Sequence, residues 1–134
     1  MAQRLEGLGY ADYRRSDAAA LRLIARRPLA VGELGAFLGV TRQAARKLVA
    51  GLEQRRYARL ERDPHDSRRR TVVLTPAGEA YAAAIVATLE TMNRELGEQV
   101  DHAALIAADA VLRASLADDS ARRRADALVA PPAP

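Results

Sequence analysis

The sequence contains no cysteine, and none of its apolar runs approaches the roughly 18 residues that suggest a membrane-spanning helix. The lack of cysteine excludes disulfide bonds, thiolate metal sites and thiol redox sensing. No apolar leader segment is present either, so we expect neither a signal peptide nor a membrane partner. The expectation is a soluble, cytoplasmic protein of one domain.

Lysine is also nearly absent, because 20 of the 21 basic residues are arginine, and these are unevenly placed. Residues 1–76 hold 16 basic against 8 acidic side chains, whereas residues 77–134 hold 5 against 9. The planar guanidinium group suits bidentate contact with phosphate or guanine. The first half of the chain is therefore the candidate for contact with a polyanion, although compositional bias would also explain scattered arginines.

A basic β-hairpin is predicted over residues 57–75. Two strand-like runs, Tyr57 to Glu61 and Arg70 to Thr75, carry β-branched and aromatic residues, and Asp63-Pro64 supplies turn chemistry between them. Like charges packed into one turn repel each other unless a polyanion relieves them.

Three helices are predicted before the hairpin. Ser16 is the expected N-cap of a helix over 17–27, and a helix over 31–38 ends at Gly39. Thr41 then caps a helix over about 42–55. The last two helices form a helix-turn-helix, and the hairpin is its wing.

One face of the helix over 42–55 carries hydrogen-bond donors and no acid in its first eleven positions. We predict that this face enters a major groove of double-stranded DNA, through the cap and four donors: Thr41, Arg42, Gln43, Arg46 and Lys47. The alternative is an ordinary solvated face of an amphipathic helix.

Two longer helices are expected after the wing. Thr75 caps and Pro76 opens a helix to about Leu96, which Gly97 ends or kinks, and a second helix follows from Asp101. The apolar stripe of the outer helix, together with Leu5 and Leu8, is interpreted as a homodimer interface; a monomeric helical hairpin is the alternative.

The fold class predicted is mainly α with a small β-hairpin wing, a winged helix-turn-helix with N- and C-terminal dimerisation helices. The expected parts are an N-terminal dimerisation segment over 1–16, the DNA-binding region over 17–76, dimerisation helices over 77–118 and a tail over 119–134.

The sequence resembles the MarR family of winged-helix transcription regulators. The resemblance lies in the run VGELGAFLGVTRQAARKLV at 31–49, the wing DPHDSR at 63–68 and the closing LTPAG at 74–78. It implies a homodimer that binds a pseudo-palindromic operator, usually as a repressor released by a small ligand.

The resemblance also implies roles for residues of the wing. Arg68 matches the arginine that enters the minor groove, and Asp63 and Asp66 match acids that hold the wing in shape. Arg62 and Arg70 are expected phosphate contacts, with Arg69 turned to the opposite face from Arg70.

A ligand site is implied between the dimerisation helices and the winged helix. The side chains expected near it are Tyr10, Tyr13, Leu21 and Tyr81.

Three residues depart from the family's usual pattern. Arg56 replaces a turn glycine, so the recognition helix must end in another way or Arg56 must adopt a strained conformation. Ala30 replaces a capping serine or threonine, and Arg46 stands where serine or threonine is common.

Other classes of function are less well supported by the residues. His65 lies with Asp63 and Asp66 on an expected exposed turn, without a nucleophile or a phosphate-binding loop, so no catalytic site, metal or cofactor is predicted. A winged helix used for protein interaction, or for non-specific architectural DNA binding without ligand response, is the remaining alternative. Salt-sensitive binding to duplex DNA distinguishes a regulator from a protein-interaction module.

Overall fold

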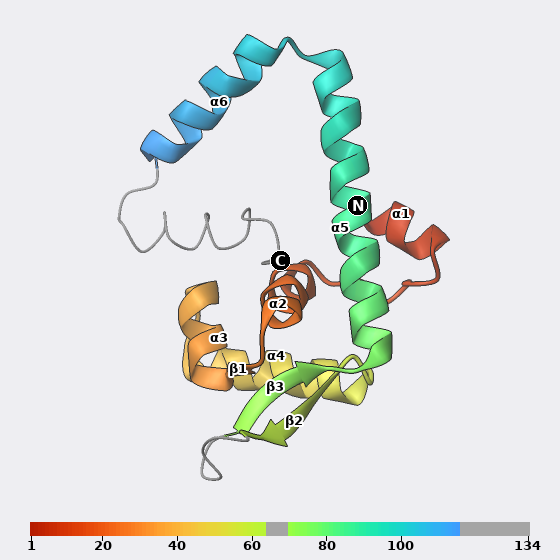
Figure 1. The fold of residues 1–134 in the computed structure, drawn as a ribbon, viewed down its shortest axis with the longest axis vertical. Helices are drawn as coiled ribbons and strands as arrows, with labels where there is room; N and C mark the ends of the chain where they lie inside the picture. The colour runs from red at the N-terminus through yellow and green to blue at the C-terminus, as the bar shows by residue number, and fades with distance from the viewer. Residues whose placement is uncertain (64–69, 116–134) are drawn as a thin grey trace.

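The computed structural model describes residues 1–63 and 70–115 (Figure 1). Its helices are α1 (Ala2–Gly7), α2 (Arg15–Arg26), α3 (Val31–Leu38), α4 (Arg42–Gln54), α5 (Pro76–Gln99) and α6 (His102–Ser115). Its strands are β1 (Leu29–Ala30), β2 (Ala58–Arg62) and β3 (Arg70–Leu74), which form one antiparallel sheet in the order β1-β3-β2. The predicted mainly α-helical winged helix-turn-helix is confirmed.

The helix-turn-helix of α3 and α4 forms as its sequence predicts. Gly39 has a φ of 66°, the left-handed conformation that glycine tolerates at the end of a helix. The Thr41 hydroxyl accepts the Ala44 N–H at 3.2 Å and caps α4. At the start of α3, where Ala30 has no capping oxygen, the Glu33 carboxylate accepts the Ala30 N–H at 2.9 Å.

The sheet differs from the prediction by one strand. β1 pairs with β3 through Leu29 opposite Val72 and Ala30 opposite Thr71. Two residues cannot display the alternation by which strands are recognised in a sequence, so only the tertiary pairing reveals β1. It ties the start of α3 to the wing.

Two helix boundaries also need correction. Ser16 is not an N-cap, because α2 begins one residue earlier at Arg15, and the Arg14 carbonyl already accepts the Asp17 N–H at 2.9 Å. Gly97 does not end α5, which continues to Gln99. A glycine in an exposed helix weakens the helix by only about 1 kcal/mol, so the neighbouring residues of high helix propensity keep it continuous.

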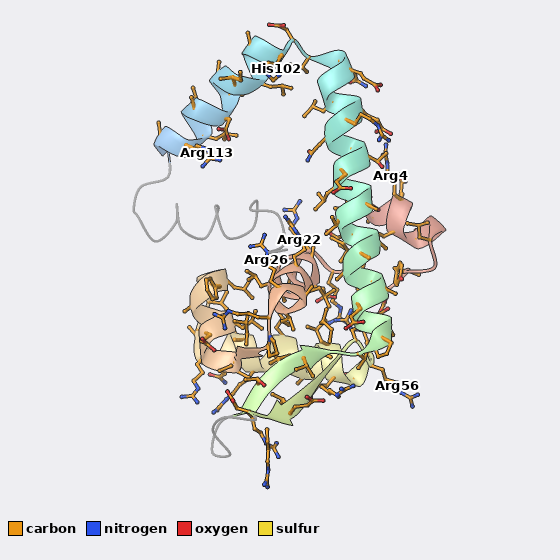
Figure 2. All side chains as sticks on the ribbon, in the orientation of Figure 1. Arg4, Arg22, Arg26, Arg56, His102 and Arg113 are labelled. Carbon is orange, nitrogen blue, oxygen red and sulfur yellow. The ribbon has the colours of Figure 1, made fainter. Side chains whose placement is uncertain are left out.

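A tight joint connects the recognition helix, the hairpin and α5. Arg56 has a φ of 61°, so the strained conformation considered from the sequence is confirmed, and its side chain extends away from the body (Figure 2). Thr75 leaves the strand to cap α5: its hydroxyl donates to the Arg56 carbonyl at 2.6 Å and accepts the Gly78 N–H at 3.1 Å. Gly78 is required there, because a Cβ atom would lie 1.8 Å from the Tyr57 carbonyl oxygen.

Helix α1 packs against α5 within the same chain. Leu5 is fully buried, so its predicted place in a dimer interface is wrong, whereas Leu8 is 59% exposed. Arg4 lies against α5 (Figure 2) and makes two hydrogen bonds to the Glu95 carboxylate, at 3.0 and 2.6 Å. The short first helix is therefore part of the monomer's own structure.

Helix α6 turns back from the far end of α5 and stands clear of the winged helix (Figure 1), and it buries none of its side chains. Ile106, Val111 and Leu112 are each more than half exposed. A helical hairpin closing on itself would bury such residues against α5, so the monomeric alternative is not what the described residues form.

Candidate nucleic-acid interface

The recognition helix α4 presents its donors to solvent. Ala45, Val49 and Leu52 are buried against the core, while the predicted donor residues Arg42, Gln43, Arg46 and Lys47 are all exposed. Burial of one stripe fixes which way the opposite face points. The structure therefore brings the four predicted residues of this helix onto one accessible surface.

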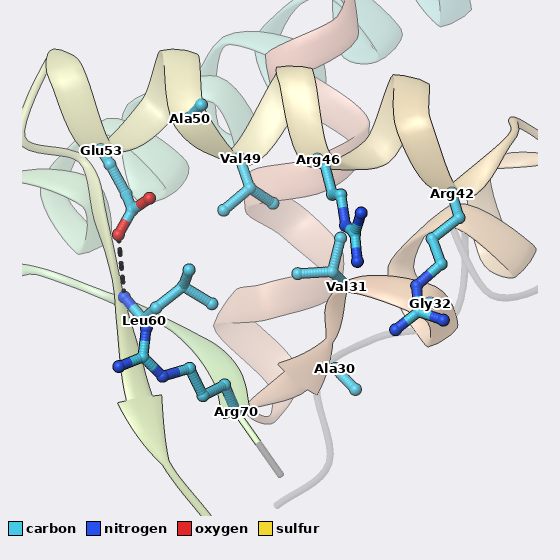
Figure 3. Close-up of a pocket in the computed structure, with 10 residues that line it drawn as sticks. All are labelled: Ala30, Val31, Gly32, Arg42, Arg46, Val49, Ala50, Glu53, Leu60 and Arg70. Atoms are coloured by element: carbon cyan, nitrogen blue, oxygen red, sulfur yellow. Dashed lines mark hydrogen bonds between the residues drawn. The ribbon is translucent and has the colours of Figure 1, made fainter.

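A cleft separates α4 from the wing sheet (Figure 3). Its volume is about 640 Å³, its apolar lining includes Val31, Val49 and Leu60, and three guanidinium groups reach it from Arg42, Arg46 and Arg70. In Figure 3, Arg42 and Arg46 point from α4 toward the segment that begins α3, away from the helix axis. The cleft joins the helix and the wing into one basic surface.

Glu53 stands at the other end of this cleft from Arg42 (Figure 3). Its carboxylate accepts the backbone N–H of Leu60 at 3.1 Å and so holds the first strand of the hairpin against the recognition helix. Arg42 and Arg46 therefore form the electropositive end of the cleft, away from this acid, whereas the side chain of Arg70 runs toward Leu60 (Figure 3).

The hairpin continues the basic surface beyond the cleft. Arg62 and Arg70 are directly opposite each other in the β2–β3 pairing, and both are exposed. Directly opposed like charges destabilise a sheet unless an anion lies between them.

Part of the predicted wing lies outside the described residues. This applies to Arg68, the predicted minor-groove contact, and to Asp66, His65 and Arg69. Asp63 is the last described residue before that gap and is half-buried. Its role in wing structure remains a prediction.

An ion-pair network that no sequence pattern predicts lies behind the recognition helix. Arg55, the residue after α4, places Nη1 2.6 Å from the buried carboxylate of Asp17 and 3.4 Å from that of Asp12. Its Nε donates to the Gly51 carbonyl at 2.9 Å, and the hydrogen bond to Asp17 raises the pKa of the guanidinium. An aspartate directly after a serine in the first turn of a helix resembles an ordinary dipole partner, so no local signal distinguishes Asp17.

Three tyrosine rings pack together beside this network, Tyr10 stacked on Tyr81 and Tyr57 tilted against it. Tyr81 lies between Tyr10 and Tyr57, with ring centroids 4.5 and 4.6 Å away, and the Tyr57 hydroxyl donates to Asp12 at 3.1 Å. Tyr81 is fully buried, and burial raises the pKa of its hydroxyl above the usual range, with the negative charge of Asp17 adding to the effect. Within the described part of the chain this buried hydroxyl has no hydrogen-bond partner.

The structure brings the four residues predicted near a ligand only partly together. Tyr10 stacks on Tyr81, and Tyr13 packs against the same core. Leu21 is completely buried in that core. A ligand at these residues remains a prediction.

Across residues 1–63 and 70–115, no group of three or more histidine, aspartate or glutamate side chains is arranged to hold a metal ion. In the same part of the chain, no helix is long and apolar enough to cross a membrane.

Comparison with known proteins identifies the winged helix. The family model described as "MarR family" matches residues 11–69. Residues 11–69 belong to the MarR family. This MarR-family region holds α2, α3, α4 and the first strand of the hairpin, and so contains the donor face described above.

Solved structures extend the MarR-like fold over most of the chain. A probable transcriptional regulator from Pseudomonas aeruginosa is 26% identical, with a TM-score of 0.66, and the match covers 83% of this chain and 84% of that one. MepR of S. aureus in a complex with DNA is 19% identical, with a TM-score of 0.68 and 82% of each chain covered. The PcaV transcriptional regulator of Streptomyces coelicolor, in complex with its natural ligand, is 22% identical, with a TM-score of 0.63 and coverage of 84% and 86%.

These matches reach well beyond the region that the family model covers. The similarity therefore includes the long helix after the wing as well as the winged helix itself. No curated protein sequence matches this chain.

Proposed function

We propose that the protein is a sequence-specific DNA-binding transcriptional regulator of the MarR type that acts in the cytoplasm as a homodimer. One observation carries the proposal: a MarR-family winged helix presents four exposed donor side chains on α4 beside a cleft lined by arginines from the helix and the wing. Phosphate contacts supply affinity for such a surface, and donors on the recognition helix supply sequence preference.

The proposal of a dimer rests on α6, whose apolar side chains are exposed in the single chain. α6 buries no side chain, although it carries Ile106, Val111 and Leu112. A second copy of α6 and the end of α5 would cover these residues about a two-fold axis. The recognition helices would then reach successive major grooves about 34 Å apart on a pseudo-palindromic operator.

Repression with release by a small ligand is the mode of action that we propose, with the ligand near Tyr10 and Tyr81. The unpartnered hydroxyl of Tyr81 supports a polar site at this place, because a buried hydroxyl without a partner is costly. A ligand there would separate the stacked rings and alter the angle between α5 and the winged helix.

A catalytic role has no comparable support. Among residues 1–63 and 70–115, the Arg55 network and the arginines of the cleft fit positioning or anion binding.

Selection from random duplex DNA, followed by measurement of affinity against salt concentration, tests the proposal. We expect a two-fold symmetric site with half-sites about 10 base pairs apart and a steep salt dependence. Weak binding without any enriched sequence would instead support an architectural DNA-binding protein. Absence of binding at low salt would support the protein-interaction alternative.

A further inference from the structure

The recognition helix divides its exposed side chains into two rows, and this division bears on how a DNA-binding surface would work. The inference rests on the proposed function. At about 100° per residue, the positions directly opposite the buried Ala45, Val49 and Leu52 form an outer row. The exposed members of this outer row are Gln43, Lys47 and Gln54.

Arg42 and Arg46 form the second row. They lie a quarter turn or less from the buried face, on the side of the wing, and both line the cleft with Arg70. Gln43 and Lys47 are not among the residues that line it. Figure 3 shows the guanidinium groups of Arg42 and Arg46 directed into the space between helix and sheet.

The wing adds charge to the same side. Residues alternate along a strand, so Arg62 and Arg70 share the face of the sheet that carries Leu60 and Val72. Leu60 lines the cleft and Val72 is fully buried, which shows that this is the face toward the helices. The hairpin arginines therefore lie on the face of the sheet that is turned toward the helices, and Arg70 lines the same cleft as Arg42 and Arg46.

We infer that Arg42, Arg46 and Arg70 hold the phosphate backbone at the wall of the groove, and that Gln43 and Lys47 read the bases. The unusual place of Arg46 in the sequence suggests a contact with either a base or a phosphate, and its position in the cleft assigns it the phosphate. The outer row is the part of α4 that would enter the groove most deeply. The amide of Gln43 matches the N6 and N7 edge of adenine, and the ammonium of Lys47 matches the O6 and N7 edge of guanine.

Three alanine variants test this division: Arg46→Ala, Gln43→Ala and, as a control with the same loss of charge as Arg46→Ala, Arg59→Ala. Arg59 is exposed, is paired with Glu61 at 2.5 Å and lies on the other face of the hairpin. Each variant is selected against random duplexes, and its affinity for the wild-type site is measured over a range of salt concentrations.

For Arg46→Ala we expect the same preferred sequence and a shallower salt dependence. The logarithmic slope should fall by about 0.9 for each lost phosphate contact, or about 1.8 for the two copies in a dimer. Gln43→Ala should leave the slope unchanged and lose preference at one base pair of each half-site, where discrimination should fall by about 5- to 150-fold. Arg59→Ala should change neither quantity appreciably.

A changed base preference in Arg46→Ala with an unaltered slope would overturn the inference, as would an unchanged preference in Gln43→Ala. If the wild-type protein itself binds no duplex at low salt, the proposed function is wrong and the division of roles falls with it. Far-UV circular dichroism of each variant establishes that the fold is intact, which the exposure of all three side chains leads us to expect.

Discussion

Arg55 connects three segments of the chain through one side chain. Its guanidinium group contacts Asp17 in α2 and Asp12 before it, and lies 5.6 Å from the centre of the Tyr57 ring at the start of the hairpin. The carboxylate of Asp17 is 2% exposed. A buried charge of this kind stabilises a protein only while its partner remains in place.

We expect Asp17→Asn to lower the free energy of unfolding by about 2 kcal/mol, because the charge-assisted hydrogen bond to Arg55 is lost inside the protein. Urea denaturation followed by circular dichroism measures the change. Glu95→Gln is the matched control: it removes a carboxylate that is also 2.6 Å from an arginine, but the pair with Arg4 is exposed. A similar loss of unfolding free energy in both variants would mean that burial does not increase the contribution of the Asp17–Arg55 pair to stability.

The buried Tyr81 hydroxyl gives a second prediction at this scale. Tyr81→Phe should raise the free energy of unfolding at neutral pH by about 1 kcal/mol, because it removes a buried polar group that has no partner among the described residues. The pKa of Tyr81 is also raised in the folded state, so the stability of the wild type should fall as pH rises above the ordinary tyrosine pKa of about 10, where the unfolded chain loses the proton more readily. The variant should therefore lose less stability than the wild type between neutral and strongly alkaline pH.

Denaturation curves at several pH values measure both effects. Tyr57 contributes an alkaline loss of its own, since burial raises its pKa as well, so some pH dependence should survive in the variant. A destabilised Tyr81→Phe would show that the hydroxyl has a partner, such as an ordered water, in solution.

At the scale of elements, the joint between α5 and the hairpin depends on Gly78. Gly78→Ala should destabilise the protein by about 3 kcal/mol, because the new methyl group would collide with the backbone of Tyr57 and neither segment can move alone. Gly97→Ala in the same helix meets no atom within 4 Å and should be stabilising by about 0.5–1 kcal/mol. Thermal unfolding of the two variants compares them directly, and equal melting temperatures would contradict the close approach.

Elements with local signals were predictable from the sequence. Thr41, Gly39 and Pro76 mark helix ends by their own chemistry, and the bounds of α3 and α4 follow from them to within a residue. β1 and the Asp17–Arg55 pair were not predictable, because each is defined by a partner about 40 residues away. The donor residues of α4 could be named from periodicity, whereas their division between cleft and outer row required the position of the sheet.

At the scale of the whole molecule, the chain places its basic surface and its uncovered apolar helix far apart. The arginine-lined cleft lies at the end of α5 that joins the hairpin, and α6 follows the opposite end (Figure 1). A second copy can therefore associate through α6 without covering the cleft. This arrangement suits a protein that must be paired while it contacts DNA.

Leu112→Glu should shift the protein from dimer to monomer, because a charge would replace a side chain that is 67% exposed in the monomer and buried in the proposed pair. Analytical ultracentrifugation measures the shift, and affinity for the full operator should fall toward that for one half-site. Ala83→Glu adds the same charge at another exposed position, in the part of α5 next to the hairpin and away from α6, and should leave the dimer intact. Equal association of both variants with the wild type would contradict an interface on this face.

The length of α5 turns small movements into changes of register. Its 24 residues form a rod of roughly 36 Å that begins at the joint with the wing. A tilt of about 5° at the far end of such a rod displaces the wing by about 3 Å, close to the 3.4 Å between successive bases of one strand. A rotation of α5 that is too small to disturb the packing at either end of the helix can therefore shift the wing by about one base pair along the DNA.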